Sequence, residues 1–324
     1  MTKENTPFQV VQLASLGDVF DAQLAERFSV LPLWTYPCEQ QALQEHGKQA
    51  IVAVTSVRKG FTREHLNMMP QLRAVCSWGV GYETLDVQAA VERKVQISNT
   101  PDVLDDCVAD LAWALLLTAA RRTAVGDRYV KGGQWKTIGA FPLSTRVWGR
   151  KLGILGMGRI GAAIAQRGSG FNMQVRYHNR SERPEFPYTY VDSLVELAKW
   201  ADFLVVACPG GDSTRHLVNA QVLNALGPKG IVVNIARGSV IDEQALVTAL
   251  EEGRLGGAGL DVLEHEPAVP QAFKAMDQIA LMPHVGSATF ETRADMAQLV
   301  FDNAVSYFES GRLLTPVAET RGFA

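Results

Sequence analysis

Short apolar runs alternate with longer amphipathic stretches along almost the whole chain. Between Phe8 and Asn99 the runs predict five strands, and the stretches between them predict four helices. A second alternation, from Lys151 to His284, predicts six further strands with helices between them. Alternating strands and helices imply a parallel sheet that is covered by helices on both faces. The pattern therefore predicts an α/β protein with two doubly wound parallel-sheet domains.

The ends of each expected element follow from where its apolar run begins and ends. The expected strands are Phe8–Leu13, Val30–Trp34, Ile51–Thr55, Arg73–Ser77, Val95–Ser98, Leu152–Leu155, Gln174–His178, Phe203–Cys208, Ile231–Ile235, Gly257–Asp261 and Ile279–Met282. The expected helices are Val19–Phe28, Glu39–His46, Thr62–Leu66, Leu85–Arg93, Val103–Arg122, Leu194–Trp200, Ala220–Leu226, Glu243–Glu251 and Glu291–Ser310. A loop with Gly132, Gly133 and Pro142 is expected before the second alternation. Because the last helix is expected to return to the first domain, we assign residues 1–101 and 286–324 to one domain and 102–285 to the other.

One stretch of the second alternation carries an informative glycine pattern. Gly156, Gly158 and Gly161 follow a short apolar run, and residues of helical character come directly after them. In a dinucleotide fold such glycines allow a tight turn, a close approach of the backbone to a pyrophosphate, and close helix–strand packing. The helix would direct free N–H groups and the positive end of its dipole at the phosphates. The pattern predicts a dinucleotide site, with a purely structural turn as the alternative.

The composition argues against several classes of function. The 324 residues carry a formal net charge of −3, which gives no basic surface for nucleic acid or an anionic membrane. The four cysteines are scattered without a C-x-x-C pair, so we expect reduced thiols and no metal site. The first seven residues contain no apolar signal region, and the apolar stretch Val108–Ala120 is too short to span a bilayer. We expect a cytoplasmic protein without nucleic-acid, membrane or metal partners.

Three charged residues stand near the ends of predicted strands, which is where doubly wound sheets bind ligands. They are Arg237, Glu266 and His284. Arginine's planar fork can bind a carboxylate and polarise the neighbouring carbonyl, and histidine can deliver a proton near neutral pH. A carboxylate beside the histidine orients the ring and favours its charged form. The three residues together suit reduction of a 2-keto acid, although each alone also fits a structural role.

Several longer motifs resemble those of the D-2-hydroxyacid dehydrogenase family. They are Trp78-Gly-Val-Gly-Tyr82, Asn99-Thr-Pro-Asp-Val103, Ile235-Ala-Arg-Gly238, Gly259-Leu-Asp-Val-Leu-Glu-His-Glu-Pro267 and Pro283-His-Val-Gly-Ser-Ala-Thr289. They cover nearly the whole chain in the family's order. Within the family the chain is most similar to hydroxypyruvate and glyoxylate reductases, including plant hydroxyphenylpyruvate reductases. The resemblance implies a Rossmann NAD(P)-binding domain inserted into a flavodoxin-like substrate domain.

The resemblance also implies roles for individual residues. Arg237 would bind the substrate's carboxylate and carbonyl, His284 would be the acid–base residue, and Glu266 would keep His284 protonated. The backbone N–H groups of Val80 and Gly81 would anchor the substrate carboxylate. Asp261, with the backbone at Ile235 and Arg237, would fix the nicotinamide carboxamide. The residues expected to bind the cofactor are Val108, Gly156, Met157, Gly158, Arg159, Ile160, Gly161, Asn179, Arg180, Ser181, Cys208, Pro209, Thr214, Ile235, Ala236, Arg237, Asp261, His284 and Gly286.

The residues after the second strand of this domain bear on the choice of cofactor. An NAD-specific fold has Asp or Glu there to hold the ribose diol, whereas this chain has His178-Asn-Arg-Ser181. Arg180 and the side chains of Asn179 and Ser181 can bind a 2′-phosphate. We therefore expect NADP(H) as the preferred cofactor and NAD(H) as the alternative. The competing interpretation is that Arg180 is an exposed residue of an enzyme that accepts both.

The resemblance implies reduction of a small 2-keto acid of the glyoxylate or hydroxypyruvate type to the D-2-hydroxy acid, with His284 as general acid. Reductases of 2-ketoaldonates or aromatic 2-keto acids, and a non-catalytic NAD(H)-sensing protein of the same fold, are the alternatives. Metalloprotease and serine hydrolase motifs, H-E-x-x-H and G-x-S-x-G, are absent.

A homodimer is also expected. Val108–Ala120 is apolar on several faces, which is unusual for a helix packed on one side only. The segment Gly132–Lys136 resembles the family segment that reaches across a two-fold interface. On this resemblance, Trp135 would border the substrate pocket of the partner subunit.

Overall fold

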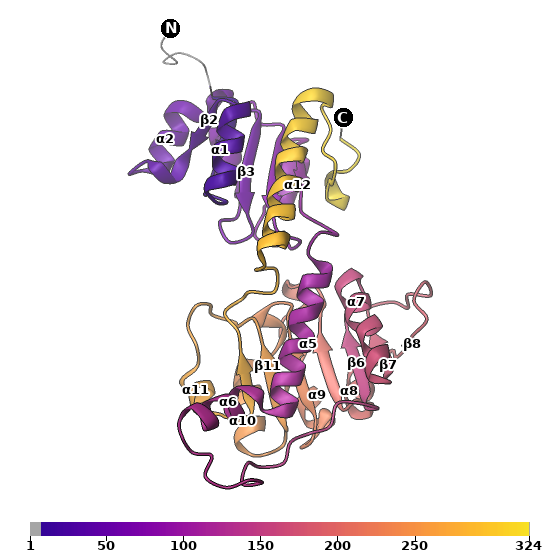
Figure 1. Cartoon of the computed structure of the whole chain (residues 1–324). Helices are drawn as coiled ribbons and strands as arrows, with labels where there is room; N and C mark the ends of the chain where they lie inside the picture. The colour runs from indigo at the N-terminus through magenta and orange to yellow at the C-terminus, as the bar shows by residue number, and fades with distance from the viewer. Residues whose placement is uncertain (1–7, 324) are drawn as a thin grey trace. The chain divides into compact units, whose positions relative to one another are not determined.

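The computed structural model describes residues 8–323 (Figure 1). The first seven residues, on which the expectation of no signal region rests, lie outside the described residues. The chain divides into two compact units: unit 1 comprises Met1–Leu104 and Thr289–Ala324, and unit 2 comprises Asp105–Ala288. The expected boundaries, after residues 101 and 285, each lie three residues before these.

Unit 1 is built around a five-stranded parallel sheet. Its strands are β1 (Val10–Gln12), β2 (Val30–Pro32), β3 (Val52–Ser56), β4 (Ala74–Trp78) and β5 (Gln96–Ser98). Its helices are α1 (Asp18–Arg27), α2 (Glu39–His46), α3 (Arg63–Met68), α4 (Val87–Glu92) and α12 (Phe290–Ser310), with short 3-10 turns η1 (Leu33–Thr35), η2 (Gly47–Gln49) and η6 (Ala318–Thr320). The strand order β2-β1-β3-β4-β5 is that of a flavodoxin-like sheet.

Both faces of this sheet are buried, which explains why its strands are almost continuously apolar. In β3, Val52 and Val54 belong to a core cluster with residues of α1 and α12. Ala53, between them, belongs to a second cluster with residues of α2, α3 and α4. Figure 1 shows α12 lying along the sheet of unit 1, so the two ends of the chain build one unit.

Unit 2 contains a seven-stranded parallel sheet. Its strands are β6 (Lys151–Leu155), β7 (Gln174–His178), β8 (Thr189–Tyr190), β9 (Phe203–Val206), β10 (Ile231–Asn234), β11 (Gly257–Leu260) and β12 (Ile279–Leu281). Its helices are α5 (Asp105–Arg121), α6 (Thr123–Lys131), α7 (Arg159–Gly168), α8 (Leu194–Trp200), α9 (Ala220–Leu226), α10 (Glu243–Glu251) and α11 (Gln271–Ala275), with 3-10 turns η3 (Ser169–Phe171), η4 (Asp212–Thr214) and η5 (Gly238–Val240).

The strand order of unit 2 is β12-β11-β10-β9-β6-β7-β8. The chain proceeds from β6 toward one edge and then resumes at β9 on the other side of β6, which is the Rossmann arrangement. Helices α8, α9 and α10 cover one face, and α5 and α7 lie on the other. The expected fold class, two parallel-sheet α/β units of which one is of the Rossmann type, is confirmed.

The main departure from the expected elements follows Arg122. A loop was expected there, but the structure has a second helix, α6. Arg122 adopts a left-handed conformation with φ +54°, which ends α5 and starts α6 in a new direction. Val125 and Tyr129 share one face of α6 but are only half-buried, so the apolar pattern of this helix is short and places no buried residue in the core. The short elements β8 and α11 were also missed, while the expected strands and helices are present with ends within two residues.

The structure also bears on the expectation that no segment spans a membrane. Among residues 8–323, no helix is both long enough and apolar enough to cross a bilayer.

Candidate active site

Five of the predicted site residues lie at one edge of the sheet in unit 2. Gly156 follows β6, Cys208 comes after β9, Arg237 after β10, Asp261 after β11, and His284 after β12. Because all these strands are parallel, their carboxyl ends meet at the same edge. The sheet topology thus brings together residues that are up to 128 positions apart (284 − 156).

The three glycines of the loop after β6 have different environments. A Cβ on Gly156, which has φ +102°, would lie 2.5 Å from the backbone nitrogen of Cys208. A Cβ on Gly161 would lie 2.1 Å from the carbonyl oxygen of Gly156. A Cβ on Gly158, the residue before α7, would meet nothing within 4 Å. The first and third glycines are therefore required by packing, whereas the second leaves open space at the amino end of a ten-residue helix, and the binding of a pyrophosphate there stays a prediction.

Asn179 connects this loop to the end of β7. Its Oδ1 accepts a hydrogen bond from the N–H of Met157 at 2.7 Å, and its Nδ2 lies 3.4 Å from the carbonyl oxygen of Met157. The Tyr190 hydroxyl donates to the carbonyl oxygen of Asn179 at 3.2 Å. Arg180 and Ser181 are exposed beyond this anchor. The side chain of Asn179 therefore shapes the loop, and its contact with a cofactor phosphate stays a prediction.

His284 and Glu266 form a close pair. Nδ1 of His284 lies 2.7 Å from Oε2 of Glu266, and Oε1 of Glu266 accepts a hydrogen bond from the N–H of Leu263 at 3.0 Å. An ionised carboxylate can only accept hydrogen bonds, so Nδ1 carries the proton in this pair. The other ring nitrogen, Nε2, is then the one that can exchange a proton with a ligand. The side chains of His284 and Glu266 are 33% and 36% exposed, so the pair is accessible.

Asp261 builds the turn that carries this histidine. Its two carboxylate oxygens accept hydrogen bonds from the N–H groups of Val285 at 2.8 Å and Gly286 at 2.9 Å. Its own carbonyl oxygen accepts one from the N–H of His284 at 2.8 Å, and His284 has φ +54°. Burial raises the pKa of Asp261, and the two N–H bonds and the charge of His284 oppose the rise. A contact of Asp261 with a carboxamide stays a prediction.

Arg237 is held in a loop that Asn234 shapes. Oδ1 of Asn234 accepts from the N–H of Ala236 at 3.0 Å, and its Nδ2 donates to the carbonyl oxygen of Arg237 at 2.9 Å. Nη1 of Arg237 donates to the carbonyl oxygen of Ala236 at 2.7 Å. A Cβ on Gly210 would lie 2.5 Å from Cγ of Arg237. Neither Asn234 nor Gly210 was predicted from the sequence, although Asn234 is a polar residue at the end of an apolar run and Gly210 belongs to a glycine pair with Gly211.

The remaining predicted cofactor residues of unit 2 lie in the same loops. Cys208 is buried, and burial raises the pKa of its thiol to about 11, so it stays neutral at physiological pH. The Thr214 hydroxyl donates to the carbonyl oxygen of Pro209 at 2.8 Å, and the N–H of Ile235 donates to the carbonyl oxygen of Val206 at 3.2 Å. Val108, on α5, lies beside Gly286: a Cβ on Gly286 would be 3.4 Å from a methyl group of Val108. Ile160 and Arg159 belong to the first turn of α7.

Val80 and Gly81 belong to unit 1, in the loop after β4. Asn99 Nδ2 donates to the carbonyl oxygen of Val80 at 2.8 Å. The Thr100 hydroxyl accepts from the N–H of Gly79 at 3.1 Å, and Gly79 has φ +132°. These bonds give the loop a defined shape. Its role toward a substrate stays a prediction.

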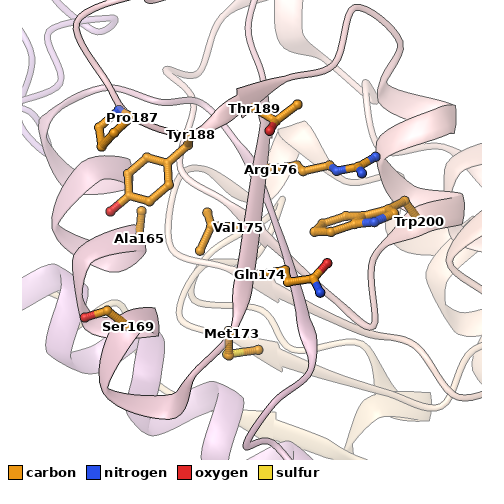
Figure 2. Close-up of a pocket in the computed structure, with 10 residues that line it drawn as sticks. All are labelled: Ala165, Ser169, Met173, Gln174, Val175, Arg176, Pro187, Tyr188, Thr189 and Trp200. Carbon is orange, nitrogen blue, oxygen red and sulfur yellow. The ribbon is translucent and has the colours of Figure 1, made fainter.

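A pocket and the possible metal ligands of the described residues were compared with the candidate site. A pocket of about 350 Å³ lies around β7. Cζ of Arg176 lies 4.4 Å from the centre of the Trp200 ring, and Tyr188 lies on the other side of the strand (Figure 2). Arg237, Glu266 and His284 are not among the residues that line the pocket, so it is not part of the candidate site. Among the described residues, no group of three or more His, Cys, Asp or Glu side chains is placed to hold a metal ion.

A Rossmann sheet whose strand ends carry an arginine and a histidine–carboxylate pair defines a dehydrogenase of the nucleotide-dependent class. Residues 113–286 match the family model of the D-isomer specific 2-hydroxyacid dehydrogenase, NAD binding domain. The chain is 44% identical to hydroxyphenylpyruvate reductase of Plectranthus scutellarioides and 42% identical to glyoxylate/hydroxypyruvate reductase A of Arabidopsis thaliana. Each alignment covers 95% of this chain and 98% of the relative.

A solved structure is similar over nearly the whole chain. It is that of the NADPH-dependent glyoxylate/hydroxypyruvate reductase from Sinorhizobium meliloti in complex with NADP and malonate, with a TM-score of 0.88 and 39% identity, covering 98% of each chain. The protein belongs to the D-isomer specific 2-hydroxyacid dehydrogenase family. The resemblance stated from the sequence motifs is thereby confirmed.

The different surroundings of the glycines give a test of the cofactor site. We expect Gly158→Ala to lower the free energy of unfolding by about 1 kcal/mol, the usual cost of alanine at an N-cap, and by no more, because the new methyl group meets open space. The same methyl group should weaken NADPH binding by about 10-fold or more, since the backbone can no longer approach the pyrophosphate closely. Urea unfolding and fluorescence titration with NADPH measure the two effects.

The matched control is Gly161→Ala, whose methyl group would overlap the carbonyl oxygen of Gly156 and should lower stability itself. Unchanged NADPH affinity in a folded Gly158→Ala protein would contradict the placement of the pyrophosphate.

Proposed function

We propose that the protein reduces a small 2-keto acid of the glyoxylate or hydroxypyruvate type to the D-2-hydroxy acid, with NADPH as the electron donor. The observation that carries this proposal is the His284–Glu266 pair, 2.7 Å apart, at the same sheet edge as Arg237 and the glycine loop. The names of the relatives, glyoxylate/hydroxypyruvate reductase and hydroxyphenylpyruvate reductase, support the same class of substrate.

The cofactor would lie along the glycine loop, with its pyrophosphate at the amino end of α7 and its 2′-phosphate near Arg180 and Ser181. When bound, the nicotinamide supplies a hydride to the carbonyl carbon. Asp261 and the backbone at Ile235 would hold the carboxamide end. The protein's own contribution is then to position the substrate, polarise its carbonyl and deliver a proton.

The residues of the site divide these tasks. Arg237 would bind the substrate carboxylate and the neighbouring carbonyl oxygen through two guanidinium nitrogens. Nε2 of His284 would donate a proton to that oxygen as it gains negative charge, while Glu266 would keep the ring oriented through Nδ1. Val80 and Gly81 would add backbone N–H donors to the carboxylate, as the family resemblance implies.

The assay that tests this proposal follows NADPH oxidation with glyoxylate, hydroxypyruvate, an aromatic 2-keto acid and a 2-ketoaldonate. We expect His284→Ala to lower kcat by about 10²–10⁴-fold, the usual effect of losing a general acid, with little change in NADPH affinity. The wild-type reductive rate should fall as pH rises and the imidazolium loses its proton. A flat pH profile together with a near-normal rate for His284→Ala would contradict the assignment.

The cofactor preference has its own test. A hydrogen bond to a charged group contributes about 1.5–3 kcal/mol, and 1.4 kcal/mol corresponds to a factor of ten in affinity. Because Arg180 is exposed and solvent screens its charge, we expect Arg180→Ala to raise the KM for NADPH by about 10-fold and to leave that for NADH nearly unchanged. The measurement is kcat/KM for both cofactors in wild type and variant.

Adding Asn179→Asp to Arg180→Ala should favour NADH outright, because the carboxylate repels a phosphate and accepts from a ribose diol. A wild-type enzyme that already prefers NADH would show that Arg180 is only a solvated surface residue.

We further propose that the protein is a homodimer. The apolar side chains of α5 are largely used within unit 2, where the helix packs on α7, β10 and β11. The segment after α6, in contrast, exposes large apolar side chains. They are Trp135, Ile138, Leu143 and Trp148, which are 58%, 91%, 99% and 55% exposed. Exposed apolar surface of this kind marks an association site, and a two-fold dimer in which Trp135 borders the partner's substrate pocket would cover it.

Light scattering should give twice the mass of one chain for the wild type. We expect the double variant Ile138→Asp, Leu143→Asp to be monomeric, because two charges in the apolar interface would lose their hydration. Val19→Asp is the control, since Val19 is 85% exposed but lies on α1 of unit 1. A wild-type monomer that is fully active at assay dilution would overturn the dimer proposal.

A further inference from the structure

A second charged cluster adjoins the loop that carries Glu266. Oε1 of Glu264 accepts a hydrogen bond from Nη2 of Arg215 and lies 3.0 Å from Nε2 of His216. The side chain of Glu264 is only 10% exposed, whereas that of Arg215 is 55% exposed. None of these three residues has a role in the proposed reaction, although Glu264 stands two positions before Glu266.

The charge of Glu264 is stabilised by its partners. Burial alone would raise its pKa, but the hydrogen bond and charge of His216 and the guanidinium of Arg215 outweigh burial, so the pKa is lowered. Glu264 is therefore ionised at neutral pH. Its backbone N–H donates to Oε1 of Glu243 at 2.7 Å, at the amino end of α10. Glu264 is thus fixed through both its side chain and its backbone.

These contacts join segments that belong to different parts of the site. Arg215 and His216 directly follow Thr214, a predicted cofactor residue, and the N–H of His216 donates to the carbonyl oxygen of Ser239 at 2.8 Å. A Cβ on Gly238 would lie 1.9 Å from the carbonyl carbon of Leu263. The loop before Glu266 therefore lies directly on the residue that follows Arg237.

A continuous chain of contacts leads from this cluster to the histidine. Leu263 directly precedes Glu264 in the chain, and its N–H donates to Oε1 of Glu266 at 3.0 Å. The other oxygen of Glu266 lies 2.7 Å from Nδ1 of His284. Because residues 261–267 contain no helix or strand, the position of this N–H depends on the side-chain anchors of the loop.

We propose that Glu264, held by Arg215 and His216, is a positioning residue that keeps Glu266 against Nδ1 of His284. The proposal rests on the proposed function. Glu264 itself touches no reacting atom. A misplacement of 1 Å in a catalytic group can cost about 10²-fold in rate, and the bond to Glu243 and the packing on Gly238 would retain part of the geometry. We therefore expect a loss of about 3–30-fold on breaking the cluster.

The test uses Glu264→Gln, which removes the charge but keeps the shape, and Arg215→Ala, which removes an exposed side chain. Both should lower kcat by about 3–30-fold and leave the KM for NADPH unchanged, because the cofactor contacts are intact. Arg215→Lys should restore most of the rate, since it keeps a cation beside Glu264. The control is Arg254→Ala, which breaks a 2.6 Å surface ion pair with Glu252 in the same unit and should leave kcat unchanged.

A second measurement does not depend on turnover. In ligand-free protein with ¹⁵N-labelled histidine, the proton on Nδ1 of His284 should give an NMR signal, assigned by its loss in His284→Gln. We expect this signal to broaden or vanish in Glu264→Gln and Arg215→Ala and to persist in Arg215→Lys and Arg254→Ala. If Glu264→Gln fails to fold, Arg215→Ala and its lysine rescue still decide the question.

The proposal is overturned if kcat and the Nδ1 signal are unchanged in the folded Arg215→Ala protein. It is also overturned if a loss of rate merely follows a lowered unfolding temperature, because that would be a structural role only. If the wild type reduces no 2-keto acid, the proposed function fails, while the NMR measurement still tests whether Glu264 positions Glu266.

Discussion

The candidate site depends on the buried carboxylate of Asp261. Its two oxygens accept the N–H groups of Val285 and Gly286, and its backbone carbonyl accepts that of His284. This one residue therefore fixes the turn in which His284 has a left-handed backbone, a conformation that costs energy for a residue other than glycine. In this turn, Nδ1 of His284 lies 2.7 Å from Oε2 of Glu266. The residue that holds the turn of the His284–Glu266 pair thus lies at the carboxyl end of β11.

Close backbone contacts make the surrounding loops equally specific. Gly156 and Gly161 pack against backbone atoms with no room for a methyl group, and Gly238 does the same against Leu263. Gly210 leaves the space that the Arg237 side chain fills. The contact of Gly161 with Gly156 lies within the segment that follows β6, whereas the other three each join two loops that follow different strands. The loops that carry the catalytic candidates are therefore parts of one packed layer at the sheet edge, and a shift in one is transmitted to the next.

The sequence was sufficient for most of the fold and for the central residues of the site, for identifiable reasons. Parallel strands buried on both faces are recognisable as apolar runs, and the polar residues that follow them mark the ligand-binding edge. It was insufficient for α6, which buries no residue, and for the pairing of Glu264 with His216, which are 48 positions apart. The bond between Asn179 and Met157 also depends on the register of β7 beside β6. Such contacts exist only once the strands are assembled.

Asn179 shows why cofactor preference and loop shape are coupled in this protein. An amide can accept from the N–H of Met157 and at the same time direct its own N–H toward the carbonyl oxygen of Met157. An aspartate at this position could still accept the hydrogen bond from the N–H of Met157. Its second carboxylate oxygen, however, would lie where Nδ2 of Asn179 is now, about 3.4 Å from the carbonyl oxygen of Met157, and two acceptors repel each other. The carboxylate would therefore tend to turn outward, where a ribose diol can satisfy it. Where no ribose diol is bound by this side chain, asparagine is therefore better than aspartate for the shape of the loop. Asparagine also places no negative charge beside a 2′-phosphate bound there. In the proposed site, Arg180 would add attraction for the 2′-phosphate where Asn179 brings no repulsion.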